Sequence, residues 1–81
     1  MNSYVATFFT HYGALKFDRF CKKTGVSSKM MPVPRKLSSS CGTCVIFEAE
    51  NHTFFEIDED LEVCYLITGQ DTYERVFVAE D

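Results

Sequence analysis

The spacing of hydrophobic positions changes along the chain, and these changes predict the first structural elements. Residues Ser3 to Phe9 are apolar on both alternating faces, as is typical of a central strand. From His11 to Thr24 apolar residues instead recur at spacings of three and four. Thr10 is a residue type that caps helices, and Gly25 supplies a stop. A strand followed by a helix is therefore predicted.

Three further segments have the character of strands. Val26 to Val33 is predicted as the second strand, and Pro32 confines it to a sheet edge because proline has no amide hydrogen for the ladder. Cys44 to Glu50 is predicted as the third strand. Thr72 to Ala79 alternates in strand fashion and closes the chain.

Residues 53–68 allow two interpretations. Thr53 to Glu56 fits a capping box, and apolar residues then recur at helical spacing until Gly69, which favours a second helix. Val63 and Tyr65 blur this stripe, so a β-hairpin is the rival interpretation. With the helix, the order is βαββαβ, which predicts an α+β, ferredoxin-like fold with a four-stranded antiparallel sheet backed by two helices.

Length and charge limit the classes of function. The 81 residues suffice for a single domain, residues 1–81. A net charge of -4 argues against a nucleic-acid surface. No apolar run approaches the roughly 20 residues of a membrane span, and the N-terminus lacks the pattern of a secretion signal, so a cytoplasmic location is expected. In that compartment, four cysteines favour metal binding or thiol chemistry over disulfides.

The segment Met31 to Cys44, MPVPRKLSSSCGTC, is unsuited to a packed core. It holds both prolines, a basic pair, a triple serine and a Cys-x-x-Cys motif between two predicted strands. Loops held by a rigid scaffold commonly carry function, so we expect Cys41 to be presented to a partner. The predicted topology places this loop beside the N-terminus of the first helix. It also places the turn of residues 69–71 nearby and sends His52 to the opposite end.

The residues around Cys41 suit a reactive thiol. Nearby cations, a helix N-terminus and inward backbone amides all favour a thiolate. The candidate binding residues are Arg35, Ser40, Gly42 and His11. His11 has two interpretations, a proton donor beside the thiol or a solvated residue at the helix start. Cys44 also has two, a resolving thiol or a small core residue.

Other chemistries find less support. A structural zinc site needs four ligands, and one Cys-x-x-Cys supplies half of them. Cys21 and Cys64 fall on core-facing stripes, which leaves His11 alone to contribute, so no metal or other cofactor is predicted. A thioredoxin-type motif opens a helix, whereas here a strand follows. Since no carboxylate pair, phosphate loop or serine triad occurs, enzymatic turnover by this chain alone is not expected.

The loop sequence MPVPRKLSSSCGTCVIF resembles the motif of the putative selenium/sulfur carrier protein-like family. That motif is a Pro-x-Pro-Arg segment, a serine-containing spacer and Cys-Gly before a strand. FFTHYGALKFDRFCKKTGV and the stretch Gly69 to Val78 are also similar to the family. The resemblance implies that Cys41 is the carrier cysteine, and that Cys44 stands where an aliphatic or small residue is usual. It assigns loop roles to Pro32, Pro34, Arg35 and Gly42.

The resulting hypothesis is a carrier that holds sulfur or selenium on Cys41 as a persulfide or selenosulfide. Its partners would be donor and acceptor proteins. The alternative is a non-catalytic interaction module that uses the sheet edge or an aromatic face to bind itself or an oxidoreductase. A zinc-binding module is the third possibility. The choice between sulfur and selenium, and the oligomeric state, stay open at this point.

Overall fold

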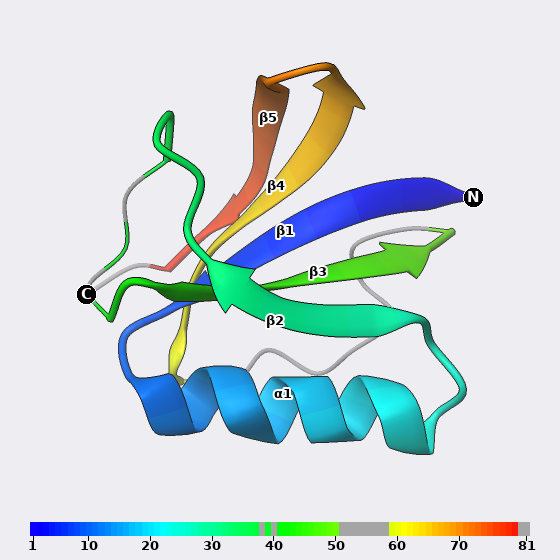
Figure 1. Cartoon of the computed structure of the whole chain (residues 1–81), viewed down its shortest axis with the longest axis vertical. Helices are drawn as coiled ribbons and strands as arrows, with labels where there is room; N and C mark the ends of the chain where they lie inside the picture. Colours follow the sequence, from blue (N-terminus) through cyan, green and yellow to red (C-terminus); the bar gives the residue numbers. More distant parts are fainter. Residues whose placement is uncertain (38, 40, 51–58, 80–81) are drawn as a thin grey trace.

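The computed structural model describes residues 1–37, 39, 41–50 and 59–79 of the chain. In this part, five strands form one antiparallel sheet in the order β2-β3-β1-β4-β5, and a single helix, α1, packs on one of its faces (Figure 1). No helix in these residues is long and apolar enough to cross a membrane.

Strand β1, Asn2–Phe8, lies at the centre of the sheet. It pairs with β3, Thr43–Ala49, on one side and with β4, Leu61–Gly69, on the other. Tyr4, Ala6 and Phe8 contribute to the core beneath the helix. The alternate residues Val5 and Thr7 face the opposite side of the sheet and are also fully buried. The prediction of a central strand is confirmed.

Helix α1, His11–Lys23, begins at the predicted cap. The Thr10 hydroxyl accepts a hydrogen bond from the Gly13 amide at 3.0 Å. Gly25, with φ +81, ends the helix in the left-handed region. Phe17 holds the helix against the sheet, with its ring centroid 5.4 Å from that of Phe8 and 5.1 Å from that of Phe47.

Strand β2, Ser28–Pro32, occupies the sheet edge, as Pro32 predicted. A buried carboxylate connects this edge strand to the helix. Asp18 accepts hydrogen bonds from Lys22 Nζ at 2.6 Å and from the Ser28 hydroxyl at 2.8 Å. Burial alone would raise the pKa of Asp18, but the two hydrogen bonds and the charge of Lys22 outweigh it and lower the pKa.

The region after residue 58 differs from the favoured prediction. Leu61–Gly69 is a strand that forms a hairpin with β5, Thr72–Val78. A second helix is therefore wrong from Leu61 onward, and residues 53–58 lie outside the described residues. The α+β class is confirmed, but the sheet has five strands and not four, and the predicted ferredoxin-like arrangement with two helices is not what these residues form.

A β-bulge explains why this strand looked helical. The register between β1 and β4 shifts, so that Thr7 pairs with Val63 while Phe8 pairs with Leu61. The extra residue turns Leu61 and Cys64 to the same core-facing side, although they are three positions apart. Their spacing therefore imitates the helical one, and Val63 belongs to the other face of a strand.

Candidate functional site

The loop of residues 33–42 joins β2 to β3 and is closed at its base. The Val33 amide donates to the Gly42 carbonyl at 3.1 Å, and Leu37 donates to the Pro34 carbonyl at 3.0 Å within a turn. Gly42 has φ +74, a conformation that a β-carbon disfavours. A β-carbon built there would meet no atom within 4 Å, so the backbone angle alone requires glycine.

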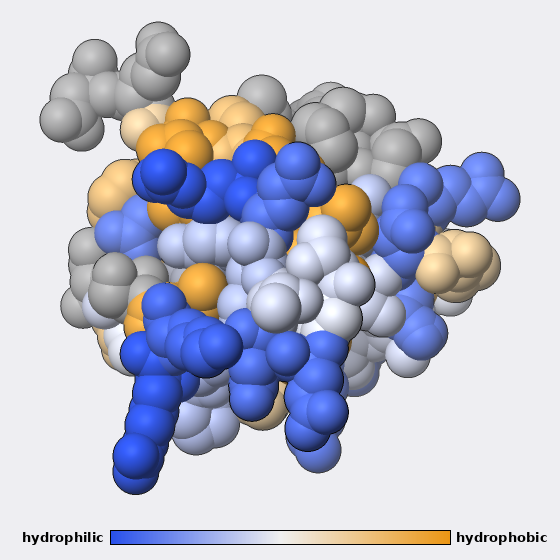
Figure 2. All heavy atoms as spheres, turned by 90° about the horizontal axis from the view of Figure 1, so that it is seen from above, coloured by the Kyte–Doolittle hydropathy of each residue, from blue (hydrophilic) through white to orange (hydrophobic). Residues whose placement is uncertain are grey.

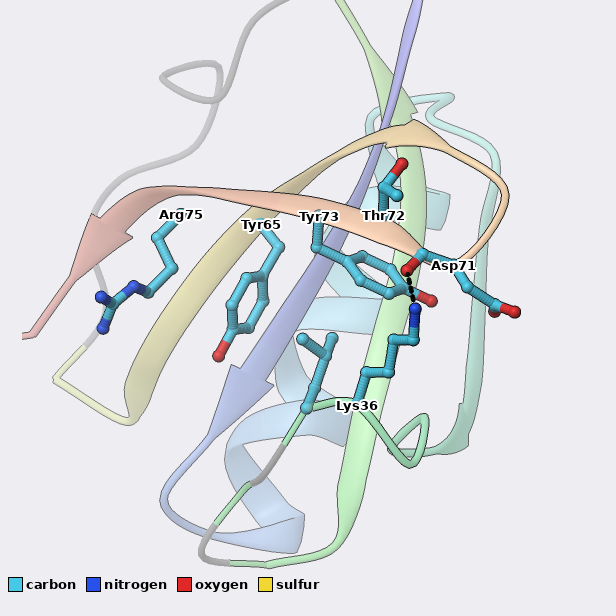
Figure 3. Close-up of a pocket in the computed structure, with 7 residues that line it drawn as sticks. Lys36, Tyr65, Asp71, Thr72, Tyr73 and Arg75 are labelled. Carbon is cyan, nitrogen blue, oxygen red and sulfur yellow. Dashed lines mark hydrogen bonds between the residues drawn. The ribbon is translucent and has the colours of Figure 1, made fainter.

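Two side-chain hydrogen bonds attach this loop to the rest of the sheet. The Ser39 hydroxyl donates to the Phe8 carbonyl at 3.1 Å, at the end of β1. Lys36 Nζ donates to the Asp71 carbonyl at 2.9 Å, in the turn between β4 and β5. Figure 3 shows Lys36 beside Tyr73 of that hairpin, and Leu37 lines the same pocket as the two hairpin tyrosines. The loop is thus attached at both ends of the sheet before it reaches Cys41.

Cys41 lies at the base of the loop and is partly exposed. Its side chain packs against the edge of the core. Its thiol donates to the Thr43 carbonyl at 3.4 Å, and its amide donates to the Ser39 hydroxyl at 3.4 Å. The Ser39 oxygen also lies 3.9 Å from the Cys41 sulfur. Cys41 therefore presents its sulfur from a backbone held by neighbouring hydrogen bonds.

The other cysteines are fully buried, and burial raises the pKa of each. Burial brings the pKa of Cys64 to about 12. Burial, together with the negative charge of Asp18, raises the pKa of Cys21 to about 12. Burial and the neighbouring Cys41 raise the pKa of Cys44 to about 11. Because the thiolate is the reactive form, these three thiols are poor nucleophiles in this conformation.

Cys44 occupies the sheet face opposite the helix. It pairs with Thr7 across the two central strands, and its thiol donates to the Pro32 carbonyl at 3.7 Å. This environment favours the interpretation of Cys44 as a small packing residue over that of a resolving thiol.

The N-terminus of α1 lies beside the loop, as the topology predicted. His11 Nδ1 is hydrogen bonded to the Thr43 hydroxyl at 3.3 Å, and the carbonyl of the same Thr43 accepts the Cys41 thiol. The ring and the sulfur are therefore joined through one intervening residue. Phe9 and Tyr12 are 41% and 65% exposed near this end of the sheet.

Other predicted neighbours are placed differently. Because β4 is antiparallel to β1, Leu61 lies beside Phe8, and the turn of residues 69–71 lies at the opposite end from Cys41. The prediction that this turn lies near the loop is confirmed at Lys36, which donates to the Asp71 carbonyl, whereas the register does not bring the turn beside Cys41. Arg35 is exposed and makes no hydrogen bond or ion pair with any described residue. Ser40 and His52 lie outside the described residues.

The site contains two residues that the sequence did not single out, Ser39 and Thr43. Ser39 lies within the triple serine and Thr43 within the Cys-x-x-Cys motif, but the sequence analysis selected Ser40 and Cys44 from these two motifs. The signal that could have identified Ser39 and Thr43 is that each lies two positions from Cys41 in the sequence. Among the described residues, no three His, Cys, Asp or Glu side chains gather closely enough to hold a metal ion.

Comparison with models of known protein families matches residues 3–57 to the family described as putative Se/S carrier protein-like. The chain belongs to this family. The match includes β1, α1 and the whole loop, and it stops before β4 and β5, so the similarity noted for Gly69 to Val78 lies outside it. No curated protein and no solved structure matches the chain.

Family membership bears on the loop most directly. All of residues 33–42 and the N-terminus of α1 fall within the matched range. A carrier family implies partner proteins in general. The β4-β5 hairpin, with the surface it forms against the loop, has no counterpart in the match.

Proposed function

We propose that this protein carries sulfur or selenium on Cys41 as a persulfide or selenosulfide and passes it to partner enzymes. The observation that carries the proposal is the contrast among the four cysteines. Three are fully buried, whereas Cys41 is partly exposed on a loop fixed by hydrogen bonds. Membership of the carrier family supports the same assignment.

Loading is an exchange of one sulfur–sulfur bond for another. The Cys41 thiolate attacks the outer sulfur of a donor persulfide, the new bond to Cys41 Sγ forms, and the bond within the donor breaks. The donor leaves as a thiolate, so the exchange involves no net oxidation. Unloading repeats the step, with an acceptor thiolate attacking the outer sulfur and Cys41 leaving. A donor with an outer selenium atom gives the selenosulfide in the same way.

The surroundings of Cys41 suit a transient carrier. Loading replaces the thiol hydrogen, which ends the hydrogen bond to the Thr43 carbonyl and frees the outer atom to turn toward solvent. Ser39 holds the Cys41 amide while its own hydroxyl is held by Phe8, so Ser39 acts as a positioning residue. His11, hydrogen bonded to the Thr43 hydroxyl, is the residue that we assign as proton donor to the departing thiolate.

We assign Cys44 to packing. Its pKa of about 11 and full burial oppose attack on a persulfide at Cys41 unless the sheet edge opens. On this assignment Cys44→Ser leaves loading intact, and it serves as the matched control for Cys41→Ser.

Intact mass spectrometry tests the proposal. The full chain is incubated with a cysteine desulfurase and cysteine, and in parallel with selenocysteine as the substrate. We expect a mass gain of one sulfur or one selenium atom in the parent protein and in Cys44→Ser, and no gain in Cys41→Ser. Alkylation and peptide mapping then locate the added atom.

The outcomes separate the proposal from its alternative. A gain that persists in Cys41→Ser would place the atom elsewhere and refute the assignment. No gain with either substrate, on a Cys41 shown to be reduced and open to alkylation, would favour a non-catalytic interaction module. In that case Cys41→Ser would leave partner binding unchanged.

A further inference from the structure

A pocket of about 430 Å³ lies between the loop and the β4-β5 hairpin, separate from Cys41. Figure 3 shows side chains from both segments facing this space. Pockets of this volume accommodate small organic molecules. Its β4 and β5 residues lie outside the range matched by the carrier family. The lining residues are Lys36, Leu37, Tyr65, Asp71, Thr72, Tyr73 and Arg75.

Two cations stand at opposite sides of the pocket. Figure 3 shows Arg75 beyond Tyr65 on one side and Lys36 beyond Tyr73 on the other. Lys36 donates one hydrogen bond to the Asp71 carbonyl, which fixes its position and leaves further ammonium donors available. Arg75 makes no hydrogen bond or ion pair with any residue in the described part of the chain.

Two nearby carboxylates, those of Asp71 and Glu74, are directed away from this space. The Asp71 carboxylate points away from Lys36, and only its backbone oxygen meets the ammonium (Figure 3). Glu74 lies between Tyr73 and Arg75 on β5, so strand alternation sends it to the other face. Glu62 lies near Tyr65 but does not line the pocket, so the two lining cations still make the pocket a local site of positive charge in a chain with a net charge of -4. Such a site attracts anions.

The centre of the pocket is aromatic. The rings of Tyr65 and Tyr73 lie 6.3 Å apart at 73°, an edge-to-face arrangement that leaves ring surface for a third ring. Leu37 adds apolar surface from the loop. Burial raises the pKa of Tyr65, against the opposing effect of Arg75 and with a smaller contribution from the Glu62 carboxylate, so its hydroxyl is a hydrogen-bond donor at neutral pH.

We propose that this pocket binds a small aromatic dianion with its negative groups at opposite ends. The ring would lie against Tyr65, Tyr73 and Leu37. One anionic group would meet Lys36 and the other would meet Arg75, each through charge-assisted hydrogen bonds. Figure 2 shows the molecule from above, with hydrophilic side chains over much of this face and apolar ones in separate patches.

Occupancy of the pocket would tie the loop to the hairpin, because Lys36 and Leu37 belong to the loop that ends at Cys41. Binding itself needs no carried atom. The inference therefore stands or fails independently of chalcogen transfer.

The test is an NMR titration of the ¹⁵N-labelled full chain with terephthalate, a benzene ring with a carboxylate at each end. We expect saturable shifts at the amides of Lys36 and of residues 71–75, with a dissociation constant on the order of 1 mM for a ligand of this size. Benzoate should bind more weakly, and the neutral terephthalamide should not produce these shifts.

Matched variants identify the cations. Lys36→Gln and Arg75→Gln should each weaken binding by at least about tenfold, the scale of a lost charged hydrogen bond. Lys23→Gln and Arg19→Gln remove exposed cations from α1 and should leave the affinity for terephthalate unchanged. Unperturbed resonances outside the pocket would show that each variant is folded.

Three results would overturn the inference. These are binding of terephthalamide as tight as that of terephthalate, binding by both pocket variants that equals binding by the α1 variants, and shifts that map to another part of the chain. Any of them would mean that Lys36 and Arg75 do not select an anion.

Discussion

Ser39 offers the sharpest test of how the loop positions Cys41. Its hydroxyl donates to the Phe8 carbonyl at 3.1 Å and accepts from the Cys41 amide at 3.4 Å. Ser39→Ala removes both hydrogen bonds without adding volume. Each neutral hydrogen bond contributes about 0.5–1.5 kcal/mol net. Since Ser39 is partly exposed, water can replace part of these two hydrogen bonds. We therefore expect the free energy of unfolding to fall by about 1–2 kcal/mol.

The assay is urea denaturation combined with a thermal scan. In a domain of this size, a loss of 1 kcal/mol lowers Tm by about 4–8 °C. Ser27→Ala is the matched control, because Ser27 is exposed and its hydroxyl makes no hydrogen bond with a described residue. We expect the free energy of unfolding of this control to stay within about 0.5 kcal/mol of that of the parent protein.

A second readout separates positioning from stability. With the anchor removed, the Cys41 backbone gains freedom, and sulfur loading should slow by up to about tenfold while the final extent of loading is retained. If Ser39→Ala matched Ser27→Ala in both stability and loading rate, the proposed role of Ser39 would be refuted.

Three other measurements address separate features. Gly42→Ala should lose about 1–2 kcal/mol in urea denaturation because of its positive φ, and Gly42→Asn should lose less; equal stability of both with the parent would contradict the backbone argument. Iodoacetamide at pH 8 should modify Cys41 before the other three cysteines, whose thiolate fractions are roughly a thousandth or less; peptide mapping that found Cys44 modified first would count against its burial. The folded-state pKa of Asp18 lies below 3.8, so its contribution is present above that pH and is lost as the pH falls through the lowered value. Asp18→Asn should flatten the stability profile in that acidic range, and an unchanged profile would exclude the Lys22 pairing as its cause.

Much of the fold was predictable from local chemistry. The helix cap at Thr10, the left-handed Gly25 and the edge position of Pro32 each follow from what one residue type can do with its backbone or hydroxyl. The strand after Leu61 was not predictable in this way. A bulge there places Leu61 and Cys64 on one face, and a bulge depends on the register with β1, which no local pattern encodes.

The candidate site also combines features that the local sequence predicts with contacts that only the tertiary structure shows. Family resemblance and loop composition pointed to Cys41, and the match over residues 3–57 confirms the family. Neither could show that Ser39 binds the end of β1, or that Lys36 reaches the distant turn instead of Cys41. Those contacts join residues 31 and 35 positions apart in the chain. They exist only once the sheet has formed.

The sequence by itself determined the α+β class, the well-capped first helix, the edge strand and the loop that carries the cysteine motif. These depend on periodicity and on the special backbones of proline and glycine, which act over a few residues. The tertiary structure decided the fifth strand, the burial of Cys44 and the pocket between loop and hairpin. Each of these depends on which segments pair and in which register, and the energy of such pairing is shared among residues far apart in the chain.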